Sequence, residues 1–159
     1  MNQPIEAPDH SESGRDTESG LLGRFIFWFS IAFALFHIWA NTFATLPELT
    51  LSALHFAGFG LLAALILPAW RGAPLWFDAL IGIAALVCGI YVVFAFDWIY
   101  NRPGIKFIWS DWLFSILAIA IVLELSRRVA GIFIPIMTLF FLSYMTWMGP
   151  MISGLFKFP

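Results

Sequence analysis

The stretch ALIGIAALVCGIYVVFAF, residues 79–96, contains 18 consecutive residues without a charged side chain. Asp78 precedes it and Asp97 follows it. An α-helix needs about 20 mostly apolar residues to cross the hydrocarbon core of a bilayer. The stretch therefore predicts a transmembrane helix, and it is one of several apolar blocks in the chain.

The composition of the whole chain also indicates a membrane protein. Of the 159 residues, 61% are hydrophobic and only 11% are charged, whereas soluble domains carry roughly 25% charged residues. Eight Lys and Arg with ten Asp and Glu are too few to cover the surface of a soluble domain of this length. We therefore predict an integral membrane protein.

Four further apolar blocks, separated by short polar segments, accompany the first. They are residues 25–46, 49–70, 109–126 and 129–156. The block at 109–126 spans a bilayer if Asp111 and Glu124, near its ends, lie at the two interfaces. The predicted fold class is all-α integral membrane, an up-and-down bundle of about five transmembrane helices. Four spans are the alternative, with the last block partly interfacial.

The first 20 residues differ from the rest of the chain. Residues 1–20 contain five acidic side chains, one Arg and no aromatic residue, a composition typical of disordered segments. We expect a disordered acidic cytoplasmic tail at 1–20 and one small transmembrane helical domain at 21–159. The acidic start does not resemble the n-region of a signal peptide.

The distribution of Lys and Arg predicts the orientation, because cytoplasmic loops carry an excess of these residues. A cytoplasmic N-terminus places five cations inside and three outside. The inner five are Arg15, Arg24, Arg71, Arg127 and Arg128, and the outer three are Arg102, Lys106 and Lys157.

Several function classes are disfavoured by what the sequence contains. The net charge of −2 argues against a nucleic-acid partner. The lone Cys88 and the scattered His10, His37 and His55 suggest no disulfide, metal or cofactor site. Catalytic motifs are also missing, so we expect neither an enzyme nor a bound cofactor, and we assign no catalytic residue.

Two histidines fall inside apolar blocks, where ionisable groups often serve function. His37 would need a partner at matching depth to relay protons, and Asn41, one turn on, is not acidic. We favour a neutral His37 bonded to a neighbouring helix, and a packing and hydrogen-bonding role for His55. The small residues Gly58, Gly60, Gly82 and Gly89 suit packing against a larger helical partner.

Glu124 precedes Arg127 by three positions and Arg128 by four, and both spacings favour ion pairs on a helix. We interpret these three residues as an ion-pair cluster that anchors the end of the helix at the membrane interface. Participation of Glu124 in transport and contact with another subunit stay open as alternatives. The hairpin at 97–111 is either an ordinary solvated loop or, through Arg102 and Lys106, a docking surface for an extracytoplasmic partner.

The stretch LELSRRVAGIFIPIMTLFFLSYMTWMGP, residues 123–150, resembles a segment near the start of fused permeases of the tripartite ATP-independent periplasmic (TRAP) transporters, of the TAXI type. In that family a Leu-Glu-x-x-Arg-Arg-x-x-Gly run leads into a Pro-containing span that ends in Tyr-x-x-x-Gly-Pro. The matching residues are Glu124, Arg127, Arg128, Gly131, Pro135, Tyr144, Gly149 and Pro150.

The resemblance implies the small, Q-type membrane domain of a bacterial inner-membrane transporter. Such systems import organic acids with a sodium or proton gradient and a periplasmic substrate-binding protein. The small domain scaffolds the large permease domain, which holds the substrate and cation sites. No substrate or ion ligand is therefore transferred to this chain, which would be either a separate subunit or part of a fused permease. A standalone membrane scaffold and, less favoured, a small membrane enzyme are the alternatives.

Overall fold

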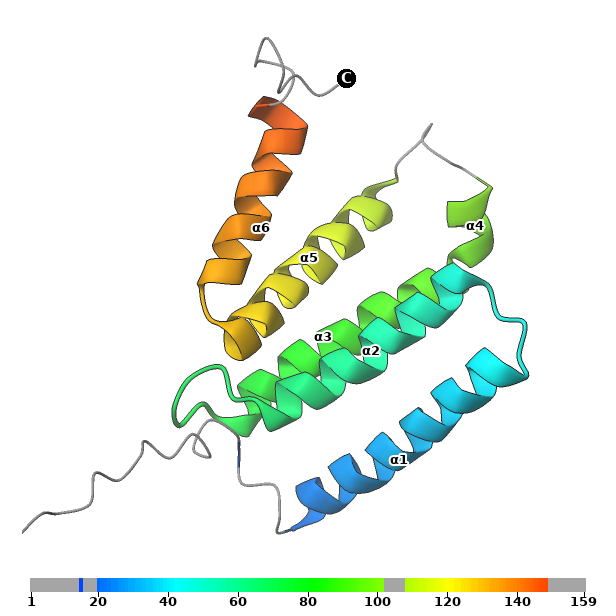
Figure 1. Ribbon diagram of the computed structural model, residues 1–159, viewed down its shortest axis with the longest axis vertical. Coiled ribbons are helices and arrows are strands. Elements are labelled where there is room, and N and C mark those ends of the chain that lie inside the picture. Colours follow the sequence, from blue (N-terminus) through cyan, green and yellow to red (C-terminus); the bar gives the residue numbers. More distant parts are fainter. Residues whose placement is uncertain (1–14, 16–19, 102–107, 149–159) are drawn as a thin grey trace, which may run out of the picture.

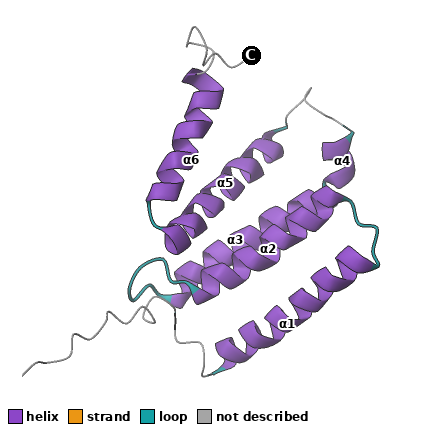
Figure 2. Ribbon diagram, viewed as in Figure 1, coloured by secondary structure: helices purple, strands orange, loops and turns teal. Residues whose placement is uncertain are grey.

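The computed structural model of the chain describes residues 15, 20–101 and 108–148, and every element in these ranges is helical (Figure 2). The predicted tail at 1–20 lies outside the described residues except for residues 15 and 20. The elements are α1 (Leu21–Thr42), α2 (Glu48–Ile66), α3 (Leu75–Phe94), α4 (Phe96–Tyr100), α5 (Trp109–Ala130), α6 (Phe133–Ser143) and a π-helical turn (Tyr144–Met148).

Three of these helices, α1, α2 and α3, are long and apolar enough to cross a membrane by length and composition. The helix α5 has 22 residues but carries charged side chains in its first turn and near its end, and α6 has only 11 residues. The all-helical fold class is thus confirmed, with three helices that fit a multi-pass membrane protein. The count of about five spans remains a prediction.

The long helices run antiparallel to their neighbours in sequence (Figure 1). The pair α2 and α3 forms the centre and has the most extensive contact in the chain. α1 packs mainly on α2, α5 packs on α3 and α2, and α6 folds back beside α5. The two outer helices, α1 and α6, therefore leave much of their apolar surface without a protein neighbour.

Glycines allow α2 and α3 to approach closely. A Cβ atom at Gly89 would lie 2.5 Å from the carbonyl oxygen of Ala53, and one at Gly60 would lie 2.7 Å from the Cβ of Ala85. Both distances are shorter than real Cβ contacts, so larger residues would push the helices apart. The expectation that the glycines face a larger partner is therefore wrong for the three in this interface. These are Gly60, Gly82 and Gly89, while Gly58 lies against Phe33 of α1.

The junction between the last two predicted blocks lies later than expected. α5 continues to Ala130, beyond the predicted end at residue 126, and α6 begins at Phe133. The chain turns at Gly131, whose φ of 75° lies in the left-handed region where a Cβ atom is unfavourable. Pro135 falls in the first turn of α6, where its missing N–H leaves no helical hydrogen bond broken. The predicted block at 129–156 therefore begins with the end of α5, and the chain bends at Gly131.

Candidate functional site

A network of charged side chains joins the end of α5 to the loop between α2 and α3. Within α5, Glu124 accepts two hydrogen bonds from Arg127, both at 2.8 Å, and one from Arg128 at 2.9 Å. These are the contacts that the spacing of the three residues favours. They hold both guanidinium groups on the side of α5 that faces the core pair of helices.

The centre of the network is Asp78, in the first turn of α3, which is completely buried. Its Oδ1 atom lies 2.9 Å from Nη1 of Arg128, whose side chain is only 1% exposed. The same oxygen accepts a hydrogen bond from the backbone N–H of Ala69 at 3.2 Å. A buried carboxylate is stable only when it is paired and hydrogen-bonded, and this one has both kinds of partner.

The third cation of the network is Arg15, which precedes α1. Its Nη2 atom donates to Oδ2 of Asp78 and, at 3.1 Å, to the carbonyl oxygen of Ala73. The backbone N–H of Arg15 donates to the carbonyl of Ile66 at 2.9 Å. Arg15 is thus bonded to both ends of the α2–α3 loop.

The arginines of α5 also donate to carbonyl groups at the end of α2 and in the loop that follows it. Arg128 donates to the carbonyls of Ala64 at 3.4 Å and Leu67 at 2.6 Å, and Arg127 donates to the carbonyl of Ala69, in the loop, at 2.7 Å. The last carbonyls of a helix have no partner within the helix, and positive charge near them is stabilising. The network therefore satisfies free carbonyl groups at the C-terminal end of α2 and holds α5 against that end.

Sequence analysis missed Asp78 and Arg15 as members of the network. Asp78 enters the prediction only as the residue that precedes the apolar stretch 79–96. Arg15 enters it only as one of the five cations assigned to the cytoplasmic side. A signal was present, because the predicted topology puts Asp78 on the same side of the membrane as Arg15, Arg127 and Arg128. A buried acid and three cations at one interface are expected to form ion pairs, and Asp78 pairs with two of these cations, Arg15 and Arg128.

The other residues of the family motif lie apart from the network. Gly131 forms the turn after α5, Pro135 is buried in α6, and Tyr144 begins the π-helical turn. Gly149 and Pro150 lie outside the described residues, as do Arg102 and Lys106 of the predicted docking loop.

A second polar contact joins α3 and α5 at their opposite ends. The hydroxyl of Tyr91 donates to Oδ1 of Asp111 at 2.6 Å and lies 2.9 Å from the hydroxyl of Ser110. The Tyr91 ring stacks on Phe114 with 4.0 Å between centroids. α5 is thus fixed to α3 at both ends, which supports its placement beside the two apolar helices of the centre.

The histidines of α1 and α2 are not scattered in space. The rings of His37 and His55 lie edge to face, with 5.0 Å between their centroids. The Nε2 atom of His37 is buried and has no hydrogen-bond partner in the described part of the chain, so the expected bond to a neighbouring helix is not found there. Among the described residues, no group of three or more His, Cys, Asp and Glu side chains is arranged to hold a metal ion.

Comparisons with protein families, with curated proteins and with solved structures find no match to this chain. The fold and the site therefore define its class. In its described residues it is all-helical, with three helices that fit a membrane, and an ion network centred on the buried Asp78 connects its helices at one end.

Proposed function

We propose that the chain is the small membrane-subunit region of a TRAP-type secondary transporter that imports organic acids with a sodium or proton gradient. In this role it scaffolds the large permease domain, fused or separate, and helps to dock the periplasmic substrate-binding protein. The ion network carries the proposal, because Glu124, Arg127 and Arg128 are also the strongest part of the resemblance.

The geometry of the network supports a scaffold more than a transport site. Asp78 and Glu124 both have arginine partners inside the chain. Carboxylates that are held by several guanidinium groups are poor ligands for a cation that must bind and leave. A transport site also needs groups near the membrane midplane that face each side in turn, whereas this network lies where α2 ends and α3 begins.

The proposed orientation places the N-terminus in the cytoplasm of a bacterium and the helices in its inner membrane, with about five spans in total. Arg15, Arg127 and Arg128 then gather at the cytoplasmic interface, where Lys and Arg are enriched. The loop containing Arg102 and Lys106 then faces the periplasm, on the side of the binding protein.

The proposal is tested by co-purification. The tagged chain is co-expressed with the large permease domain encoded beside it or fused to it, and the complex is isolated in mild detergent. We expect the two to elute together in equal amounts. A folded chain that never retains the permease domain would contradict the proposal and favour a standalone membrane scaffold.

A further inference from the structure

Aromatic side chains that carry a polar group gather at both ends of the α3–α5 pair. At the end opposite the ion network, they belong to α4 and to the first turn of α5, which lie at the same end of the bundle (Figure 1). These exposed side chains are Trp98, Tyr100, Trp109 and Trp112. At the end with the ion network, Trp70 and Trp76 are exposed. An indole or phenol combines an apolar ring with a hydrogen-bond donor, so both groups suit a boundary between hydrocarbon and water.

The spacing of the two aromatic groups matches the thickness of a bilayer. α3 has 20 residues and α5 has 22, so the helices are about 30 Å and 33 Å long. The hydrocarbon core of a bilayer is ~30 Å thick. Trp76 lies in the first turn of α3, and Trp98 lies in α4, just beyond the end of α3. α3 therefore separates the two groups by the distance between the two surfaces of a membrane.

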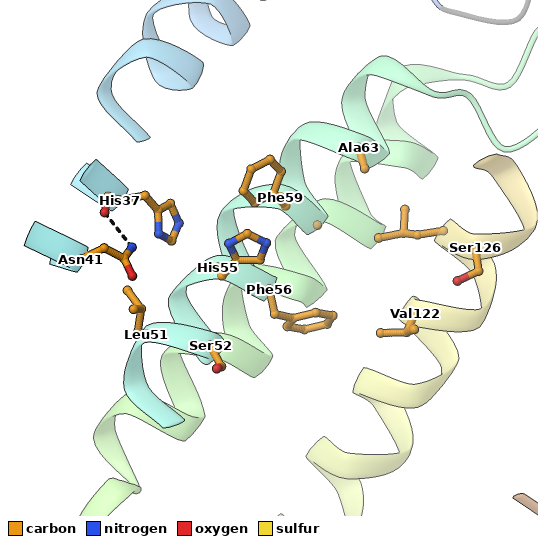
Figure 3. A pocket seen from close by; sticks show the side chains of 12 residues that line it. His37, Asn41, Leu51, Ser52, His55, Phe56, Phe59, Ala63, Val122 and Ser126 are labelled. Atoms are coloured by element: carbon orange, nitrogen blue, oxygen red, sulfur yellow. Dashed lines mark hydrogen bonds between the residues drawn. The ribbon is translucent and has the colours of Figure 1, made fainter. Parts of the chain in front are cut away.

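The outer surface between the two aromatic groups is apolar. On α3 and α5, the exposed side chains in this interval are hydrophobic apart from Ser115. On the other two long helices, the imidazoles of His37 and His55 lie against each other (Figure 3). The large exposed side chains of the interval include Leu80, Ile83, Val87 and Ile90 on α3, and Leu113, Ile116 and Ile119 on α5. Such a surface suits contact with hydrocarbon chains.

The charged side chains of α5 lie at the two ends of this apolar surface. Residues 112–123 contain none. Asp111 accepts a hydrogen bond from Tyr91 of α3 at 2.6 Å, and Glu124 with its arginine partners belongs to the ion network at the other end. The charges of α5 are therefore level with the two aromatic groups, where headgroups and water can reach them.

We propose that the two aromatic groups are the surfaces through which the chain contacts phospholipid headgroups, with α5 crossing the hydrocarbon core beside α3. Each ring occupies the outermost hydrocarbon, and its N–H or O–H donates to a phosphate or ester oxygen of the lipid. A bilayer explains both groups and their spacing, whereas a protein partner at one end would explain only one of them. The inference goes beyond the proposed function, because it does not depend on the identity of the transporter.

Spin labels measure the depth of these residues in a bilayer. The full chain with Cys88→Ala receives one further substitution, which is Trp76→Cys, Trp109→Cys, Val87→Cys or Ile119→Cys. Each new cysteine carries a nitroxide, and the chain is reconstituted in phosphatidylcholine vesicles. Collisions with oxygen, which concentrates in hydrocarbon, and with a water-soluble nickel chelate give the depth, calibrated with lipids labelled at known positions. All four new cysteines replace exposed residues, where substitutions leave the fold intact, and circular dichroism checks each variant.

The expected depths follow from the proposed placement. Labels at Val87 and Ile119, which are 45% and 43% exposed, should lie ~15 Å below the headgroups, at the middle of the hydrocarbon core. Labels at Trp76 and Trp109 should lie in the headgroup region, which is about 5–7 Å thick on each side. Ile83→Cys and Ile116→Cys repeat the measurement inside the core if a first variant does not fold.

Three results would overturn the inference. A label at Ile119 that reaches the nickel chelate as readily as a headgroup-labelled lipid would place α5 outside the hydrocarbon core. A label at Ile119 that is shielded from both reagents would show that protein, and not lipid, covers this face. Labels at Trp76 and Trp109 that lie deep in hydrocarbon or free in water would remove the headgroup contact. Co-purification with the permease is a separate measurement, so this inference and the proposed function can fail independently.

Discussion

The carboxylate of Asp78 and the guanidinium of Arg128 meet at 2.9 Å although 50 residues separate them in the sequence. Their side chains are 0% and 1% exposed, respectively. Each charge would be unfavourable at this position without the other. This pair therefore determines how the start of α3 and the end of α5 fit together.

Replacing Asp78 by Asn leaves the buried Arg128 with only Glu124 as its acidic partner. We expect the free energy of unfolding to fall by about 3 kcal/mol, the lower end for a broken buried pair, because Glu124 still contacts Arg128. Cys88, the single cysteine, is 2% exposed, so its reaction with a thiol-specific fluorophore on heating reports unfolding. Asp97→Asn, at an exposed position, is the matched control. Equal unfolding temperatures for both variants would contradict the role of Asp78.

Glu124→Gln should have a smaller effect. The Glu124 side chain is 28% exposed, and Gln keeps an oxygen that accepts one arginine hydrogen bond, so we expect a loss of about 1 kcal/mol. Assembly with the permease weakens modestly, and any assembled transporter keeps its ion coupling. Altered cation dependence of uptake with normal assembly would instead make Glu124 a transport residue.

Gly89→Val should separate α2 from α3. The new side chain would meet the backbone of Ala53, which cannot move without shifting α2, and overpacking of this kind costs roughly 1–3 kcal/mol. The loss of stability should appear in the same thiol-labelling measurement as reaction of Cys88 at a lower temperature. Ala32→Val adds bulk at an exposed position of α1 and should leave the unfolding temperature unchanged. A stable Gly89→Val variant would refute the close contact of the two helices.

The orientation is tested with reporter fusions. A reporter at Gly20 should be active in the cytoplasm, and one placed in the loop at 101–105 should be active in the periplasm, because five cations favour the cytoplasmic side. The reverse pattern at both positions would overturn the topology and move the ion network to the periplasmic face.

The sequence predicts the helical elements better than their contacts. Residues 79–96 indicate a membrane helix because length and apolarity are local properties, and α3 covers most of that stretch. The contacts of Glu124 with Arg127 and Arg128 follow from helical spacing for the same reason. The meeting of Asp78 with Arg15 and Arg128, and of His37 with His55, depends on how separate helices pack. Spacing along the chain indicates which residues lie at a similar depth, but not which side chains face each other.

Uptake by reconstituted protein tests the central claim most directly. Vesicles that contain this chain alone should show no gradient-driven uptake of organic acids. Vesicles that contain the chain, the large permease domain and the binding protein should show it, and uptake should be lost when the chain is left out. Uptake by the isolated chain, or full uptake by the permease and binding protein without it, would contradict the account.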